Sequence, residues 1–320
     1  MAAYVFDLGI LGGRGVVLLP PIGRESEMIR GSGKGTGRNL WARIGWVFFL
    51  SGLLFGVGVT SATAAPKAVP WSFWAAYDPA GQVRVDHGPW NQFLKEYVVA
   101  NHPSGVNRVR YASVTPEDRK ELADYLQRLQ VVKVTRLKRS EQKSYWIDLY
   151  NALTVKVVLD HYPVQSIRDI KISPGLFSSG PWGAKLLTIQ GQKVSLDDIE
   201  HRILRPLWKD NRVHYAVNCA SLGCPNLQPE AYTPENTDAL LEKGAREYVN
   251  HSRGVRMSGD RLLLSSIYDW FREDFGGSEE SVSRNLQMYA NPELAIPHVR
   301  PLPAVAYGAD RGPFLMCASR

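Results

Sequence analysis

Two cysteines that lie close together in the sequence are the residues best suited to covalent chemistry. Cys219 and Cys224 are separated by the four residues Ala-Ser-Leu-Gly, and His214 lies five residues before Cys219. A cysteine becomes a nucleophile when its pKa is lowered and a base lies within hydrogen-bond reach. One hypothesis is therefore a hydrolase or acyl transferase acting on amide or ester bonds, with Cys219 as the nucleophile and His214 as its base.

Four further polar residues could assist such a reaction. Asn218 or Asn151 could orient the histidine or donate a hydrogen bond to an oxyanion. Glu200 and His201 are adjacent in the sequence and suit acid–base chemistry, although such a pair also occurs on solvated helix faces. Because a buried amide must be hydrogen-bonded, Asn151 could equally well pin a neighbouring loop.

The spacing of the cysteines also allows a disulfide between Cys219 and Cys224. A loop that contains Gly223 can bring their Cα atoms within the roughly 4.4–6.8 Å that a disulfide requires. In this alternative the protein is a non-catalytic binding or assembly module of the envelope, and the disulfide closes its binding loop. A zinc site made from these cysteines with His214 and His201 would match no standard ligand spacing, so we expect no metal and no cofactor.

Two elements must position these side chains. Residues 213–218 alternate in character and predict a short strand with His214 and Asn218 on one face, either in a cleft or along a half-buried edge. Asn151 lies in a segment from about residue 140 to residue 161 that is apolar on most sides, which is typical of a buried central helix. Pro163 should end that helix.

Capping residues and periodicity predict the remaining elements. Helices and short strands interleave irregularly, which predicts an α+β fold: a single compact domain with a buried central helix and a small, mostly antiparallel sheet. We expect helices over residues 89–97, 115–130, 195–208, 233–250, 267–275 and 279–289, a strand over 108–114, and hairpins around 191–192 and 258–260.

The N-terminal region has the features of a secretory signal peptide over residues 28–64. A basic stretch over 30–43 precedes an apolar run over 44–59, and Ala62-Thr63-Ala64 fits the small-residue cleavage pattern. The apolar run is shorter than the roughly 20 residues of a membrane span. We therefore expect an exported protein, periplasmic or secreted, with Met28 as the hypothetical true start and residues 1–27 as an upstream extension.

The composition and net charge limit the kinds of partner that we expect for this protein. The chain is 44% hydrophobic and 22% charged, which is ordinary for a globular protein. Its formal net charge of +7 lies partly in residues 1–65 and is too mild to indicate nucleic acid binding. We expect no nucleic acid partner, membrane contact only through the signal segment, and an envelope polymer or protein as the candidate partner.

Five segments, taken in order, resemble the domain-of-unknown-function family 547, a family of uncharacterised bacterial and plant proteins. The resemblance covers about residues 87–290, with an irregular segment over 66–86 before it and a Pro-rich tail over 291–320 after it. It implies no activity. Asp148 stands where the helix motif of the family would have Asn. The segments are residues 145–152, 180–182, 195–201, 214–225 and 266–275.

A weaker analogy connects the chain to transglutaminase-like and papain-like folds, which place a buried helix beside a short sheet. In an active member of that superfamily the helix would carry a nucleophilic cysteine. The helix around Asn151 contains no cysteine, so the analogy concerns the fold and does not establish an activity.

Overall fold

The computed structural model describes residues 66–175, 179–258, 261–294 and 305–307. The predicted signal segment, the upstream extension and most of the Pro-rich tail lie outside the described residues. The chain divides into two units, and all described residues belong to the second, Thr60–Arg320. Within these described ranges, no helix combines the length and the apolar character that crossing a bilayer requires.

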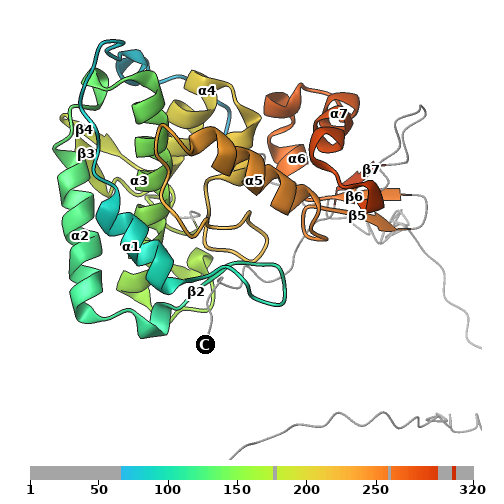
Figure 1. The fold of residues 1–320 in the computed structure, drawn as a ribbon, viewed down its shortest axis with the longest axis horizontal. Coiled ribbons are helices and arrows are strands. Elements are labelled where there is room, and N and C mark those ends of the chain that lie inside the picture. Colours follow the sequence, from blue (N-terminus) through green and yellow to red (C-terminus); the bar gives the residue numbers. More distant parts are fainter. Residues whose placement is uncertain (1–65, 176–178, 259–260, 295–304, 308–320) are drawn as a thin grey trace, which may run out of the picture. The chain divides into compact units, whose positions relative to one another are not determined.

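Helix α3, Arg139–His161, lies at the centre of the first hydrophobic core. Every residue over 141–155 is buried, which confirms the predicted buried central helix. Helices α1 (Gly88–Tyr97) and α2 (Pro116–Gln130) pack on one side of this arrangement (Figure 1). Helix α2 begins as predicted, because the Thr115 side chain accepts a hydrogen bond from the Asp118 backbone N–H.

The strands form three small sheets, so the prediction of one small sheet was wrong. Each strand has only two to four residues, and such short pairs cannot form one continuous sheet, so the helices supply most of the core. In the third sheet β7 runs parallel to β6, whereas the other pairs are antiparallel. The pairs are β1 (Val98–Val99) with β2 (Arg108–Val109), β3 (Leu187–Ile189) with β4 (Gln192–Val194), and β5 (Val255–Ser258) with β6 (Arg261–Leu264) and β7 (Val305–Tyr307).

Both predicted hairpins are present, and the turn of the first lies one residue earlier than the predicted 191–192. In the β3–β4 hairpin Ile189 pairs with Gln192, so Gln190 and Gly191 form the turn. Both residues have positive φ angles, 46° and 77°. A two-residue hairpin turn of this kind matches the twist of the strands, and glycine adopts it at little cost.

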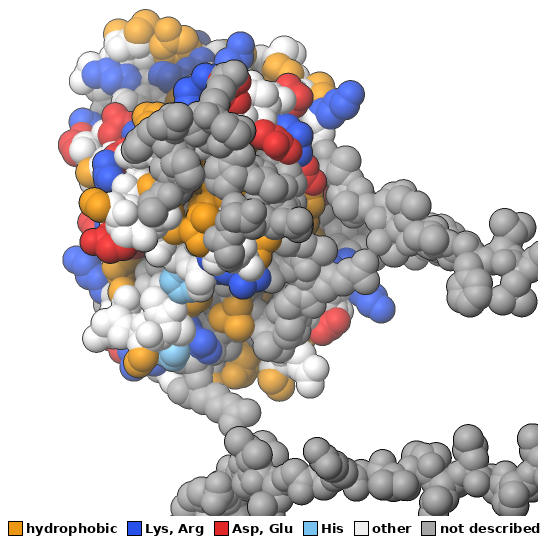
Figure 2. Space-filling view, turned by 90° about the vertical axis from the view of Figure 1, so that its right-hand side faces the viewer, with side chains coloured by type: hydrophobic (Ala, Val, Ile, Leu, Met, Phe, Trp, Pro, Cys, Tyr) orange, Lys and Arg blue, Asp and Glu red, His pale blue; other side chains and the backbone are white. Residues whose placement is uncertain are grey.

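A second hydrophobic core includes residues of helix α5 (Thr237–Val249), α6 (Ile267–Trp270) and α7 (Glu279–Tyr289). Helix α5 contributes to both cores, with Leu241 in the first core and Tyr248 in the second. On the face shown in Figure 2, Lys and Arg side chains lie among Asp and Glu side chains, so the charge visible there is mixed in sign.

Four predicted elements differ in the structure. The predicted helix over 267–275 is α6 followed by a separate 3-10 helix, Arg272–Phe275. Helix α5 begins at Thr237 and not at residue 233; a turn over 234–236 leads into it, and the side chains of Thr233 and Asn236 bond each other's backbone N–H groups across this turn. The predicted helix over 195–208 is a π-helix, Asp198–Leu204, followed by α4, Arg205–Trp208. The strand predicted over 108–114 is only the two residues of β2.

The strand predicted over 213–218 was also wrong. Residues Asn211–Tyr215 form a 3-10 helix, and the segment pairs with no strand of the described chain. The Asp210 carboxylate accepts a hydrogen bond from the Arg212 backbone N–H at 3.0 Å. This cap turns the chain into a helix, and alternation of side-chain character alone could not reveal it.

Candidate functional site

Cys219 and Cys224 form a disulfide, with their Cα atoms 6.2 Å apart. The loop around this disulfide is tied to α3 by Asn151, whose Nδ2 donates to the Ala216 carbonyl and whose Oδ1 accepts from the Asn218 N–H, both at 2.9 Å. Asn151 therefore pins the loop, as one of the two interpretations of this residue expects.

The side chain of Asn218 closes the same loop. Its Nδ2 donates to the Pro225 carbonyl at 2.6 Å, and its Oδ1 accepts from the Ala220 N–H at 2.8 Å. Both sulfur atoms are bonded to each other, so neither is a thiolate in this form. Within the described residues, no hydrogen bond or ion pair joins His214 to Cys219.

Three predicted site residues, Glu200, His201 and His214, lie in one ion network. His214 Nε2 lies 2.7 Å from an Asp274 oxygen, which also accepts from Arg205 Nε at 2.5 Å. Arg205 Nη1 lies 3.0 Å from His201 Nδ1, and His214 Nδ1 lies 4.0 Å from Glu200 Oε1. The π-helix places Glu200 and His201 in this network, and α4 places Arg205.

Asp274 is the ionised carboxylate at the centre of this network. Burial alone would raise the pKa of Asp274, but the hydrogen bonds from His214 and Arg205 outweigh burial and lower that pKa to about 2. The Phe271 ring stacks on His214, with ring centroids 4.1 Å apart. Arg205 also donates to the Pro66 carbonyl at 2.7 Å. The network thus holds the π-helix against the C-terminal helices and the start of the described chain.

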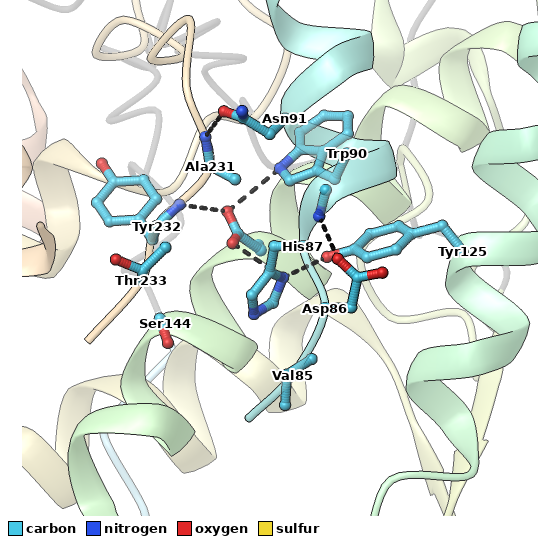
Figure 3. Close-up of polar contacts among 12 residues, drawn as sticks. Val85, Asp86, His87, Trp90, Asn91, Tyr125, Ser144, Ala231, Tyr232 and Thr233 are labelled. Atoms are coloured by element: carbon cyan, nitrogen blue, oxygen red, sulfur yellow. Dashed lines mark hydrogen bonds and ion pairs between the residues drawn. The ribbon is translucent and has the colours of Figure 1, made fainter. Parts of the chain in front are cut away.

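A second polar group, which the sequence did not reveal, surrounds His87 (Figure 3). His87 is the N-cap residue of α1, and Asp148 lies in the middle of α3. His87 Nδ1 lies 2.6 Å from the Tyr125 hydroxyl and 3.2 Å from Asp148 Oδ2. Asp148 Oδ1 accepts from Trp90 Nε1–H at 3.2 Å and from the Tyr232 backbone N–H at 3.1 Å.

Burial favours the uncharged forms of the side chains in this group. It lowers the pKa of His87 to about 4 and raises the pKa of Asp148 and that of Tyr125 well above their ordinary values. The Tyr125 hydroxyl keeps its proton at neutral pH, because its pKa is raised, and it lies 2.6 Å from His87 Nδ1 as the hydrogen-bond donor. Since Nδ1 must accept a hydrogen bond, we assign the ring proton to Nε2.

Beside this group lies a hollow of about 340 Å³. Arg84 spans it, with its guanidinium 3.1 Å from Glu141 on α3 and 2.8 Å from Glu235. His87 Nε2 is buried and has no hydrogen-bond partner among the residues that the structure describes. The hollow is lined by Arg84, Val85, His87, Glu141, Thr233, Pro234 and Glu235.

A larger hollow, of about 680 Å³, lies between α1 and α2. Two of its polar side chains bond a third one: Tyr97 donates to Asp118 at 2.5 Å, and the Thr115 hydroxyl donates to the same carboxylate at 2.7 Å. For the whole described part of the chain, no group of three or more His, Cys, Asp and Glu side chains could hold a metal ion.

One signal in the sequence could have revealed the group around His87. Glu141, Ser144 and Asp148 recur at helical spacing, so they share one face of α3. Acidic residues in a helix that is apolar on most sides must find partners. The sequence offers no way to identify His87 as the partner of Asp148, because His87 lies far from Asp148 along the chain.

The fold and these buried polar groups define an α+β protein composed mainly of helices, with small sheets and a disulfide-closed loop. Residues 134–249 match the family model described as "Protein of unknown function, DUF547", so the chain carries this domain, as the sequence motifs predict. The matched range includes α3, the disulfide and Asp148, but not His87. Neither the curated proteins nor the solved structures contain a match to this chain.

Proposed function

We propose that this protein is exported and acts as a non-catalytic binding or assembly module that contacts a polymer or protein of the cell envelope. The observation that carries the proposal is the Cys219–Cys224 disulfide. Disulfides persist in oxidising compartments such as the periplasm, and a signal segment over residues 28–64 would deliver the chain there. A disulfide between the two sulfur atoms also removes the nucleophile that a cysteine-dependent reaction needs.

The loop between the two cysteines is held in one conformation. Tyr248 donates to the Gly223 carbonyl at 2.8 Å, and Arg253 donates to the Leu222 carbonyl at 3.3 Å. Gly223 is exposed, so this fixed loop reaches the protein surface. A preorganised loop supports binding because less conformational entropy is lost when a partner docks.

Intact mass spectrometry tests the proposal. The full chain is expressed with a Cys317→Ser substitution, purified from the envelope, and weighed before and after reduction. We expect a chain that begins after Ala64 and gains the mass of two hydrogen atoms on reduction. Iodoacetamide should label Cys219 and Cys224 only in the reduced sample. An uncleaved leader, or rapid labelling of Cys219 without reductant, would contradict the proposal.

The second candidate function is a Cys/His-dependent hydrolase or acyl transferase. The gathering of Glu200, His201 and His214 in one network favours it. In a reduced protein, Cys219 would be the nucleophile, with His214 as its base. Activity on ester or amide substrates that requires reduction, and that a His214→Ala substitution abolishes, would support this candidate over the binding module.

A further inference from the structure

The Nε2–H group of His87 is a buried donor that needs an explanation. The His87 side chain is 5% exposed, and no acceptor for Nε2–H lies among the described residues. Buried polar groups in native proteins are nearly always hydrogen-bonded, so an exception points to a ligand or an ordered water. In Figure 3, Nε2 lies on the side of the His87 ring away from Tyr125.

The hollow that His87 lines has both a donor and acceptors. The buried Glu141 carboxylate accepts from the Val85 N–H at 2.7 Å and from Arg84 at 3.1 Å, and Glu235 is exposed at the rim. Two carboxylates and one guanidinium give the lining a negative balance, which disfavours an anionic ligand. A volume of about 340 Å³ is within the usual range of small-ligand pockets.

We propose that this hollow binds an uncharged peptide amide, whose carbonyl oxygen accepts from His87 Nε2–H. The amide N–H of the same ligand is the natural donor to the carboxylates of Glu141 and Glu235. Arg84 bridges these two carboxylates across the hollow, so its side chain moves aside when the ligand enters. The inference rests on the proposed binding function, because it gives that function a site and a ligand class.

A peptide is favoured over a sugar by the lining. An N-acetylated sugar presents the same amide group, but sugar rings commonly stack on aromatic side chains. Histidine is the only ring side chain among the residues that line the described hollow, apart from the Pro234 pyrrolidine. The side chains of Glu141 and Glu235 instead suit the repeated N–H groups of an extended peptide.

The test is an NMR titration of the mature, disulfide-bonded protein with N-acetyl-Ala-Ala-amide. We expect a saturable shift of the His87 Nε2–H resonance in the unaltered protein. His87→Phe, which keeps a ring but removes the donor, should weaken binding at least about tenfold, whereas His87→Gln, which restores an N–H donor, should recover most of it. The charged ligand N-acetyl-Ala-Ala should bind more weakly than the amide.

Three results would overturn the inference. The amide could fail to bind, which would leave an ordered water as the partner of Nε2–H. It could bind without moving the His87 resonance, or N-acetylglucosamine could bind more tightly than the peptide. Because the unaltered protein supplies the first measurement, poor folding of a variant cannot mimic these results. The mass measurement tests the disulfide and export separately, so failure of the amide titration alone removes only this site.

Discussion

At the scale of single residues, the buried environment of Asp148 explains why Asp can stand where the family motif would have Asn. An uncharged carboxylic acid has one hydrogen-bond donor and one carbonyl acceptor, as an asparagine amide does. Burial raises the pKa of Asp148, which favours the protonated side chain where the motif would have Asn. Trp90 and Tyr232 donate to its Oδ1 at 3.2 and 3.1 Å, which an amide oxygen could accept equally well.

His87 and Asp148 have opposite effects on the pH dependence of stability. The pKa of His87 is about 4 in the folded protein and 6.5 in the unfolded chain, so its contribution is complete above pH 6.5 and is lost as pH falls towards 4. The raised pKa of Asp148 means that the folded state binds more protons above pH 3.8, which favours folding as pH falls. As pH falls from 6.5 to 4, the two effects therefore have opposite signs.

Substituting Asp148 by Asn should expose the His87 effect. We expect Asp148→Asn to fold, and its free energy of unfolding to fall by about 3 kcal/mol between pH 6.5 and 4, which is the full contribution of His87 at about 1.4 kcal/mol per pKa unit. The fall should be smaller in the unaltered protein, where Asp148 acts in the opposite direction. Urea unfolding at several pH values measures this. Asp160→Asn, at the exposed end of the same helix, is the matched control. Identical pH profiles for Asp148→Asn and the unaltered protein would refute the opposing effect of Asp148.

At the scale of elements, the sequence predicts structure that depends on neighbouring residues. It does not predict structure that depends on contacts between distant segments. The cap at Thr115 and the turn at Gln190 and Gly191 depend on neighbouring residues, so sequence predicted α2 and the β3–β4 hairpin correctly. Residues 213–218 alternate like a strand, but the Asp210 cap and the absence of a pairing strand in the described chain make a 3-10 helix. Sequence found His214 and Glu200 but not Asp274, which bonds His214 from a distant helix.

Asn151 connects two elements, and its removal should be costly. Asn151→Ala leaves the Asn218 N–H and the Ala216 carbonyl without this partner inside the protein. We expect a loss of about 2–4 kcal/mol in the free energy of unfolding, because each buried group left unpaired costs about 1–3 kcal/mol. Urea unfolding measures the loss, with Asn101→Ala in an exposed turn as the control. A loss no larger than that of the control would show that the loop does not need this pin.

The disulfide should stabilise the same loop by a smaller amount. It closes a short loop with a sequence separation of 5. In the chain-entropy view such a loop contributes about 2 kcal/mol. We expect the double substitution Cys219→Ser and Cys224→Ser to lower the free energy of unfolding by that amount, measured by urea unfolding. Cys317→Ser should leave it unchanged, and equal stability of the double variant would refute a structural role.

At the scale of the whole molecule, the ion network lies where the two hydrophobic cores meet. Leu204, at the end of the π-helix, belongs to the first core, and Tyr215 and Phe275 belong to the second. Arg205 directly follows Leu204, and His214 directly precedes Tyr215. Asp274 bonds both Arg205 and His214. Asp274 therefore couples the π-helix side of the molecule to its C-terminal helices.

This coupling predicts how the molecule unfolds when Asp274 is changed. Asp274→Asn leaves Arg205 buried without its carboxylate, which should cost about 3 kcal/mol. Native-state hydrogen exchange should then show amides of α7 opening before those of α3, whereas in the unaltered protein both helices should open together. Asp269→Asn removes a half-exposed ion pair with Arg272 and should change neither helix. If α3 and α7 lose protection equally in Asp274→Asn, the network stabilises the molecule without coupling its two cores.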